Sequence, residues 1–387
     1  MKGRNIVKIF VIPSGYPNKY NKNSCIYIHE QIKKLQSQDV EIVILDASAY
    51  RVDKWMDKNC FKIERKTFEG VNIISLHYFG LMQSRLPRLN MLLYNIQLKS
   101  IYKKAVQIYG KPDILHAHFS FLSGYATYKL SKQYNIPYIV TEHYSLFLQQ
   151  KLNKYIKKIT YITIENAEKF ICVSDTLRKA VIRHTNTERE IDVVPNMISE
   201  QYVFHEKPIK NCFKFFSAGN LVKSKGFNIL IEAFCKSFDV NDKIILYIGG
   251  QGSEYSNLSN LISLKKRDHQ IILLGQLTKN KMLEEYIECD CFVLPSRYET
   301  FGIVYREALA VGRPIISTKN GGIEEGWHDS FGKLIEVDDI NGLSNAMKYM
   351  VNNIVEFDCK RISKQCLEYF YSDYITNQIL KIYMEGL

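Results

Sequence analysis

Residues 291–319 read CFVLPSRYETFGIVYREALAVGRPIISTK. An apolar run leads into a polar loop, then an amphipathic stretch from Ile303 to Val311, a stop at Gly312 and Pro314, and a second apolar run. Strand, helix and strand at this spacing predict one right-handed βαβ unit. Units of this kind build a parallel sheet that is covered by helices.

The same alternation precedes this unit along the chain. Apolar and amphipathic runs follow one another as FKFFSAG (213–219), GFNILIEAFCKSF (226–238), KIILYIGG (243–250), SEYSNLSNLI (253–262), IILLG (271–275) and NKMLEEYIEC (280–289). The second half of the chain is therefore predicted to be a Rossmann-like lobe.

The first half repeats the pattern less regularly. Its predicted strands are IVKIFVIP (6–13), EIVILDA (41–47), VNIISLHY (71–78), ILHAHF (114–119), PYIVTEH (137–143) and KFICVS (169–174). A polar connection near residues 200–212 separates the halves, and the last stretch of the chain reads as a helix with no strand after it. We therefore expect an α/β chain with an N-terminal domain at 1–202, a C-terminal domain at 203–370 and a closing helix at 371–387.

The charge of the chain is uneven. The net charge is +12 over 387 residues, but residues 1–200 hold 30 Lys and Arg against 17 Asp and Glu, whereas the remainder holds 22 against 23. The first lobe is therefore expected to face something anionic, which could be a membrane surface, a nucleic acid or a phosphorylated substrate. The simpler alternative is charge that serves solubility.

Cysteine usage and hydropathy exclude other classes. The nine cysteines contain no Cys-x-x-Cys pair, and Cys172, Cys235 and Cys291 lie in apolar runs, as expected for reduced thiols in a cytosol. Cys289 and Cys291 have no further soft ligand nearby, so no metal is expected. No run of about 18 apolar residues is present, and the first apolar run reads as a strand rather than a leader.

A candidate phosphate site lies in FSAGNLVKSKGFNILIEAF (216–234). A strand ends in a turn at Gly219, and a loop with Lys223 and Lys225 leads into a helix that begins near Gly226. Backbone N–H groups at a helix start, joined by a lysine, attract an anion. The spacing is not that of a Walker loop, and a plain turn with solvated lysines is the alternative. The glycine-rich turn GGQGSEYSNL (249–258) also lacks the dinucleotide-binding pattern.

The opening stretch places Glu299 at the mouth of the predicted helix and Glu307 further along it. The N–H groups of Phe301, Gly302 and Ile303 lie between these two carboxylates, and the glycine allows a ligand to approach the backbone. Carboxylates suit sugar hydroxyls and N–H groups suit phosphates, so a nucleoside diphosphate sugar would satisfy the whole stretch. The alternative is that Glu299 caps the helix and Glu307 lies on a solvated face. A glycosidase pair is disfavoured, since eight helical positions span about 12 Å.

PSRYETFGIVYREALAVGRPIISTKNGGIEE (295–325) resembles the donor-site signature of glycosyltransferase family 4. The same order of motifs runs through PSGYPNKYNKNSCIYIHEQIKKL (13–35), DILHAHFS (113–120), PYIVTEH (137–143), VVPN (193–196) and GNLVKSKGFNILIEAF (219–234). The resemblance implies the GT-B fold, in which two Rossmann-like lobes face a central cleft and a C-terminal helix packs back toward the N-terminal lobe. It also implies a retaining enzyme that uses nucleotide sugars.

The resemblance assigns roles by position. Glu299 would hold hydroxyls of the transferred sugar, Glu307 the ribose hydroxyls, and Lys225 the diphosphate. His118, the second histidine of HAH, would lie near the sugar and the acceptor, although by itself it could be a structural histidine at a strand end. Glu325 falls on the acidic position after the glycine pair.

Two departures from the family pattern affect the donor loops. Where many members carry an arginine, this chain has Asn220 beside Gly219, so Lys225 is expected to be helped only by backbone N–H groups and by Lys223 or Arg297. The first glycine loop reads NSCIY (23–27) where a glycine often precedes the aromatic residue. Its expected flexible point is Gly15.

The implied reaction transfers a sugar from a nucleoside diphosphate sugar, with a UDP-sugar favoured, to an acceptor hydroxyl with retention. No cofactor or metal is expected, because the chain has no Asp-x-Asp pattern. A lipid-linked saccharide of O-antigen or capsule biosynthesis is the expected acceptor. A sugar-nucleotide 2-epimerase of the same fold is the alternative, and nucleic-acid binding is disfavoured.

Two basic segments suggest where such a lipid would be met. RLPRLNMLLYNIQLKSIYKK (85–104) and QQKLNKYIKK (149–158) are partly amphipathic and are expected to rest on an anionic membrane leaflet. Ordinary core helices with a lysine edge are the alternative. The expected location is the cytoplasm, with peripheral attachment to the cytoplasmic face of the inner membrane.

Overall fold

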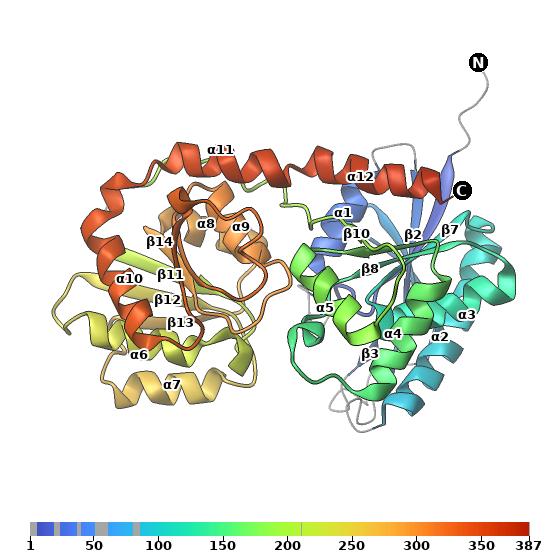
Figure 1. Cartoon of the computed structure of the whole chain (residues 1–387), viewed down its shortest axis with the longest axis horizontal. Coiled ribbons are helices and arrows are strands. Elements are labelled where there is room, and N and C mark those ends of the chain that lie inside the picture. Colours follow the sequence, from blue (N-terminus) through green and yellow to red (C-terminus); the bar gives the residue numbers. More distant parts are fainter. Residues whose placement is uncertain are drawn as a thin grey trace, which may run out of the picture. The chain divides into compact units, whose positions relative to one another are not determined.

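The computed structural model describes residues 6–18, 24–36, 40–50, 61–79, 86–209 and 211–386. The chain forms two compact units (Figure 1). Unit 1 comprises Met1–Met197 with Ser372–Leu387, and unit 2 comprises Ile198–Tyr371. The sequence places the corresponding boundaries at 202 and 370.

Unit 1 contains an eight-stranded sheet in the order β10-β9-β8-β7-β1-β2-β5-β4. Its strands are β1 (Val7–Ile12), β2 (Val40–Asp46), β4 (Glu64–Phe68), β5 (Val71–Ser75), β7 (Ile114–His118), β8 (Tyr138–Glu142), β9 (Lys169–Cys172) and β10 (Asp192–Val193). All pairs are parallel except β4 with β5, and a separate pair joins β3 (Ala49–Tyr50) to β6 (Tyr78–Phe79). Each of the six strands predicted for this half is present.

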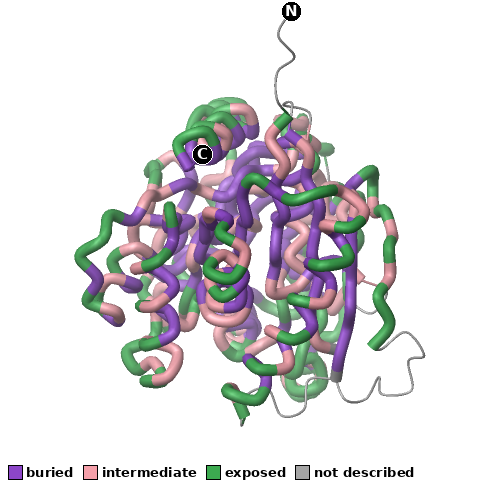
Figure 2. The backbone as a smooth tube through the Cα atoms, turned by 90° about the vertical axis from the view of Figure 1, so that its right-hand side faces the viewer, coloured by how far each residue is buried: buried purple, intermediate pink, exposed green. Residues whose placement is uncertain are grey.

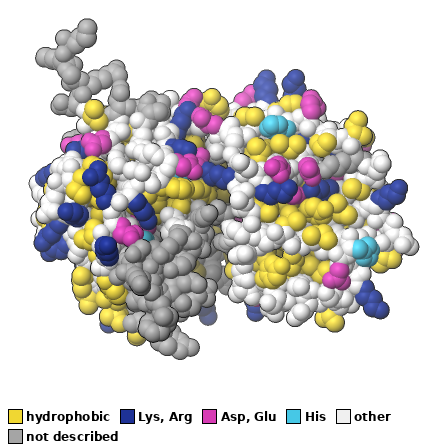
Figure 3. All heavy atoms as spheres, turned by 180° about the vertical axis from the view of Figure 1, so that it is seen from behind, with side chains coloured by type: hydrophobic (Ala, Val, Ile, Leu, Met, Phe, Trp, Pro, Cys, Tyr) yellow, Lys and Arg dark blue, Asp and Glu magenta, His cyan; other side chains and the backbone are white. Residues whose placement is uncertain are grey.

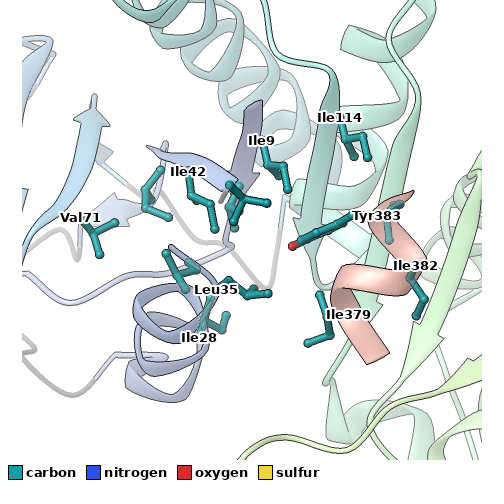
Figure 4. Packing of buried hydrophobic residues seen from close by; sticks show 14 of the residues in the cluster. Ile9, Ile28, Leu35, Ile42, Val71, Ile114, Ile379, Ile382 and Tyr383 are labelled. Atoms are coloured by element: carbon teal, nitrogen blue, oxygen red, sulfur yellow. The ribbon is translucent and has the colours of Figure 1, made fainter. Parts of the chain in front are cut away.

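Helices cover this sheet, whose strands form its buried layer (Figure 2). They are α1 (Ile26–Gln36), α2 (Pro87–Tyr109), α3 (Tyr125–Tyr134), α4 (Lys154–Asn166), α5 (Asp175–Thr185) and α12 (Ser372–Glu385). The closing helix α12 puts Ile375, Ile379 and Tyr383 into the same core cluster as Ile9 and Ile114 (Figure 4). Packing of the C-terminal helix on the first lobe, as predicted, is confirmed.

Unit 2 contains a wholly parallel sheet in the order β13-β12-β11-β14-β15-β16. Its strands are β11 (Phe213–Ala218), β12 (Ile244–Gly249), β13 (Ile271–Gly275), β14 (Cys291–Leu294), β15 (Ile315–Thr318) and β16 (Gly332–Ile335). Its helices are α6 (Phe227–Ser237), α7 (Tyr255–Leu264), α8 (Lys279–Glu288), α9 (Ile303–Ala310), α10 (Ile340–Asn353) and α11 (Cys359–Phe370). The predicted Rossmann-like lobe is confirmed.

Strand order determines where loops gather. In unit 2 the order reverses between β11 and β14, and in unit 1 it reverses between β1 and β7. Ligands of open α/β sheets bind outside the carboxyl ends of the strands at such a switch point. Within the described ranges, no helix combines the length and the hydropathy needed to cross a bilayer.

Candidate active site

The β11–α6 loop and the β14–α9 loop lie together at the switch point of unit 2. Gly226 has a φ of +70°, and a Cβ there would collide with the carbonyl oxygen of Pro295. Gly250 and Gly252 are placed likewise against the carbonyl oxygens of Gly219 and Leu221. The glycine-rich turn after β12 therefore supports the candidate phosphate loop by close backbone packing.

Lys225 and Glu299 form an ion pair in this loop cluster. Lys225 Nζ lies 2.5 Å from Glu299 Oε1, and Ser296 Oγ donates to the same oxygen at 2.8 Å. The backbone N–H of Glu299 donates to the carbonyl of Asn320 at 3.0 Å, and the Glu299 side chain is only 11% exposed. The residues assigned from the sequence to the sugar and to the diphosphate are thus direct neighbours.

Helix α9 begins close to this pair, at Ile303. Gly302, with a φ of +71°, is the N-cap residue, and the described contacts of the Glu299 carboxylate are to Lys225 and Ser296 rather than to the N–H groups of α9, so the alternative in which Glu299 caps α9 is wrong. A Cβ on Gly322 would lie 2.9 Å from the backbone nitrogen of Phe301. Glycine at residue 322 therefore allows close packing against the backbone of Phe301, and the first N–H groups of the helix that starts at Ile303 have no acceptor within the helix itself.

Glu307 lies further along α9, where Glu307 Oε2 is 2.9 Å from the Tyr286 hydroxyl. Glu307 is half-buried, so it is not a fully solvated residue of the helix surface. Tyr286 is fully buried, and burial, with the neighbouring Glu307 carboxylate, holds the pKa of Tyr286 well above 10. The tyrosine therefore stays a neutral donor that orients one oxygen of Glu307.

Glu325 lies in the glycine loop that follows β15. A buried arginine donates hydrogen bonds to the backbone of this loop. Arg306 is 0% exposed, and its Nη2 donates to the carbonyls of Gly322 at 3.3 Å and Glu325 at 2.5 Å. Its guanidinium carbon lies 4.2 Å from the ring centroid of Phe370. Burial lowers the pKa of Arg306 to about 10, which still leaves it charged near neutral pH. Arg306 therefore fixes the backbone of the loop that carries Glu325.

Lys223 and Arg297, which were expected to help Lys225 bind a diphosphate, have different surroundings in the structure. Asn220 and Lys223 are exposed. Arg297 Nη2 lies 2.7 Å from Asp338 Oδ1, and Arg297 Nη1 donates to the carbonyl of Lys223. Arg297 is thus committed to Asp338, and the expectation that it serves a diphosphate is not supported by this geometry.

The site residues of unit 1 gather at the ends of β1, β7 and β8. His118 is 1% exposed, and its Nδ1 lies 2.9 Å from Nε2 of His143. Ser14, next to Gly15, contacts Ser123 through their hydroxyl oxygens at 2.9 Å, and Ser123 Oγ also donates to the carbonyl of His118. The Gly15 loop and the His118 loop are thus neighbours within unit 1.

Glu142 connects the loops after β7 and β8. Its Oε1 accepts hydrogen bonds from the backbone of His143 and Tyr144, each at 2.8 Å, and its Oε2 accepts from the backbone of Ser120 at 2.9 Å. Burial raises the pKa of Glu142, while these donors oppose the rise. This carboxyl group fixes the loop that follows His118 and the backbone at His143.

The structure collects the predicted residues into two groups, one in each unit. Unit 2 contains Gly219, Asn220, Lys225, Glu299, Phe301, Gly302, Ile303, Glu307 and Glu325, and unit 1 contains Gly15 and His118. Their supporting residues were missed from the sequence: Ser296, Asn320, Tyr286, Arg306, Glu142 and His143. Only Arg306 carried a local signal, as a charged residue within an apolar helix.

Comparison with known proteins agrees with this architecture. The profile described as Glycosyltransferase Family 4 matches residues 26–202, and the profile described as Glycosyl transferases group 1 matches residues 199–365. An uncharacterized glycosyltransferase of Methanocaldococcus jannaschii is 28% identical over 353 residues, covering 90% of this chain and 89% of its own length. A Bacillus subtilis glycosyltransferase named for teichuronic acid biosynthesis is 24% identical over 82% of each chain.

Solved structures show the same fold at low sequence identity. Sucrose-phosphate synthase from Thermosynechococcus elongatus superposes with a TM-score of 0.80 at 18% identity, covering 98% of both chains. The Anabaena protein HepE in complex with UDP superposes with a TM-score of 0.74 at 16% identity, over 98% of this chain and all of that one. The chain is a glycosyltransferase that belongs to glycosyltransferase family 4 and has the GT-B fold.

Proposed function

We propose that the chain transfers a sugar from a nucleoside diphosphate sugar to an acceptor hydroxyl with retention at the anomeric carbon. The observation that carries this proposal is the Lys225–Glu299 pair at the mouth of α9, with Glu307 further along the same helix. Glu299 suits the hydroxyls of the transferred sugar, Lys225 and the first N–H groups of α9 suit the diphosphate, and Glu307 suits the ribose hydroxyls. The complex of the related fold with UDP supports a nucleotide at such a site.

The chemical step needs charge stabilisation at the leaving group. As the bond from the anomeric carbon to the diphosphate oxygen breaks, negative charge grows on the diphosphate, and Lys225 with the N–H groups of Phe301 and Ile303 stabilises it. The acceptor oxygen forms the new bond to the same carbon, and its proton passes to the leaving phosphate oxygen. A diphosphate that takes over Lys225 would also release Glu299 to bind sugar hydroxyls.

The proposal is tested by nucleotide release. The purified chain is first screened by thermal shift against UDP-, GDP- and ADP-sugars, and the stabilising donor is then incubated with candidate acceptors. Lys225→Ala and Glu299→Gln are expected to lower the rate at least about a hundredfold, the size of effect seen when one transition-state donor is lost. Lys265→Ala, which removes the 2.7 Å ion pair with Glu232 in the same unit, is the matched control and is expected to keep full activity.

Two outcomes contradict the proposal. Unchanged turnover in both Lys225→Ala and Glu299→Gln would remove the donor assignment. Conversion of the donor sugar without an acceptor, followed by NMR, would show an isomerase rather than a transferase. Retention is checked on the product by the anomeric coupling constant.

We further propose that the acceptor is a lipid-linked saccharide of polysaccharide biosynthesis at an anionic membrane surface, the cytoplasmic face. Exposed hydrophobic side chains at the start of α2 are Leu86, Leu89, Leu92 and Ile96, and the exposed basic ones that follow are Lys99, Lys103 and Lys104. Their spacing of three or four residues puts them on one stripe of the helix. We call this stripe the α2 face.

Basic residues of α4 extend the charge beside it. Arg88 of α2 lies 5.5 Å from the ring centroid of Tyr155 in α4, and Lys154 and Lys158 of α4 are exposed. Dark-blue basic side chains and yellow hydrophobic ones lie side by side on unit 1 in Figure 3. Exposed hydrophobic groups flanked by lysines suit an anionic leaflet, where each lysine near the surface adds about 1 kcal/mol.

Sedimentation with liposomes tests the α2 face. The chain is expected to sediment with anionic vesicles and to stay in solution with neutral ones. The double variant Leu92→Asp with Ile96→Asp is expected to lose this binding, whereas Leu264→Asp, which changes a leucine 80% exposed on unit 2, is expected to keep it. Equal sedimentation with both kinds of vesicle would overturn the membrane proposal without affecting the donor assignment.

A further inference from the structure

Three histidines at the ends of β7 and β8 form a buried row in unit 1. The ring centroids of His116 and His118 are 4.5 Å apart, and those of His118 and His143 are 5.2 Å apart with an interplanar angle of 26°. Burial lowers the pKa of His116 and of His143 to about 3, and burial together with the two neighbouring rings holds the pKa of His118 well below 6.5. At neutral pH each ring therefore carries one N–H, and its second nitrogen is an acceptor.

The rings of His116 and His143 differ in whether they make a hydrogen bond to His118. His116 is fully occupied, because its Nδ1 lies 2.7 Å from the Tyr383 hydroxyl and its Nε2 lies 2.8 Å from Thr141 Oγ1. Only His143 makes a hydrogen bond to the His118 ring, at 2.9 Å between His118 Nδ1 and His143 Nε2, within the part of the chain that the structure describes.

This contact allows two arrangements of protons. Either His118 carries its proton on Nδ1 and donates it, or His143 carries its proton on Nε2 and donates it. In the first arrangement His143 must carry its own proton on Nδ1. In the second arrangement Nδ1 of His143 is unprotonated and offers a lone pair.

The second nitrogen of His143 decides between them. His143 Nδ1 is buried and has no hydrogen-bond partner among the described residues. The rings of Tyr27 and Phe119, with centroids 5.1 Å and 5.2 Å from that of His143, offer at most weak acceptor faces. Buried N–H groups without an acceptor are rarer in folded proteins than buried acceptors without a donor. The arrangement that leaves a lone pair at Nδ1 is therefore the more stable one.

We propose that His143 donates from Nε2 to Nδ1 of His118 and thereby fixes His118 as the tautomer with its proton on Nε2. His143 is then a positioning residue, and Glu142 holds its backbone in place. Nε2 of His118 is the ring nitrogen left for a ligand, because the described residues give it no partner. His118 meets that ligand as a hydrogen-bond donor.

The N–H group at Nε2 of His118 can bind only a ligand atom that accepts a hydrogen bond. A hydroxyl, carbonyl or phosphate oxygen of a sugar substrate fits, and a group that has to give up a proton to His118 does not. His118 is then excluded as general base, which agrees with proton transfer to the leaving phosphate. The identity of the ligand rests on the proposed function, whereas the tautomer does not.

NMR of the histidine side chains in the whole ¹⁵N-labelled chain tests the tautomer directly. The expected result for His118 is an unprotonated Nδ1 and a protonated Nε2, with the signals assigned by a His118→Gln variant. A protonated Nδ1 would overturn the proposal, whatever the enzyme acts on. This measurement needs no substrate and no variant of His143.

Variants of His143 test the consequence for catalysis. Gln places an amide N–H near the position of Nε2 and is expected to keep the His118 tautomer and most of kcat. Leu removes the donor and is expected to release the tautomer and to lower kcat about tenfold with little change in donor KM, the size expected for one lost hydrogen bond.

His184→Gln and His184→Leu are matched controls. They change a buried histidine of the same unit whose Nε2 lies 3.1 Å from the carbonyl of Phe147, and neither is expected to move the His118 signals. Equal kcat for His143→Gln and His143→Leu would contradict the positioning role. If the tautomer is as expected but no nucleotide sugar is turned over by the unaltered chain, the proposed function fails and the positioning of His118 remains.

Discussion

The two units bury basic side chains in opposite ways. Unit 1 buries His116, His118 and His143, which lose their charge because burial lowers their pKa. Unit 2 buries Arg313 and Arg306, and Arg306 stays charged near neutral pH because burial lowers its pKa only to about 10. A buried charge needs acceptors and a neutral imidazole needs only one donor and one acceptor. In unit 2 a charged arginine therefore fixes the loop backbone. In unit 1 the arrangement depends on which ring nitrogen of each neutral histidine carries the proton.

Replacing the arginines should give the largest effect. Arg306 donates to carbonyls of the glycine loop, whereas Arg313 donates to the carbonyls of Tyr286 at 3.1 Å and of His205 at 3.0 Å. Arg306→Met and Arg313→Met each leave buried carbonyls without a donor and should lower the free energy of unfolding by about 3 kcal/mol. Only Arg306→Met should also raise the KM for the nucleotide sugar, by about tenfold.

Chemical denaturation and steady-state kinetics measure the two quantities separately. Arg306→Lys should restore part of the donor affinity, because an ammonium group still reaches one carbonyl. An equal rise of donor KM in Arg306→Met and Arg313→Met would show that Arg306 acts through general stability alone.

The next largest effect is expected from low pH, which should destabilise unit 1 more than unit 2. For His116, with an ordinary pKa of 6.5 that burial lowers to about 3, the unfolded state binds more protons between these values, so stability falls as the pH falls. From pH 7 to pH 5 the loss should be about 2 kcal/mol each for His116 and His143, since both shifts are alike. The buried carboxyl of Glu142, whose pKa is raised, acts in the opposite direction.

Hydrogen exchange, corrected for intrinsic rates, locates the change. Amides of β7 and β8 should lose protection between pH 7 and pH 5, while amides of β11 and β14 should keep it. A double variant, His116→Gln with His143→Gln, should reduce the response of unit 1 to the part that His118 contributes. Equal loss in both sheets would contradict the role of the histidines.

Two tyrosine hydroxyls give the smallest and most specific test. Tyr286→Phe removes the donor to Glu307, and Tyr383→Phe removes the partner of His116 at 2.7 Å. Each should cost about 1 kcal/mol of stability. Only Tyr286→Phe should weaken UDP or another matching nucleotide, by about fivefold, as measured by calorimetry. Unchanged nucleotide affinity would show that Tyr286 does not act through Glu307.

The parallel sheets could be predicted because their strands are local apolar runs with helices between them. β4, with the sequence ERKTF, was missed because its charged residues suit an antiparallel edge, which needs only one buried face. β10 was missed because two residues carry no periodicity.

The candidate site was predictable only in part. Motif order named Lys225 and Glu299, and the reversal of strand order at β11 and β14 brings their loops together. The partners of Arg306 are backbone carbonyls and the ring of Phe370, and nothing in the sequence marks a carbonyl as an acceptor. The roles of Lys225, Glu299, His118, Glu307 and Glu325 stay predictions.

Helix α12 has a consequence for biosynthesis. Ile379 and Tyr383 complete a core whose other members, such as Ile9 and Ile114, leave the ribosome hundreds of residues earlier. Unit 2, by contrast, is one uninterrupted segment, Ile198–Tyr371. The part of the chain that is synthesised first thus stays incomplete until the last helix emerges, while the inserted segment can close its own core beforehand. During translation, unit 1 would begin to emerge first, but unit 2 would complete its fold first.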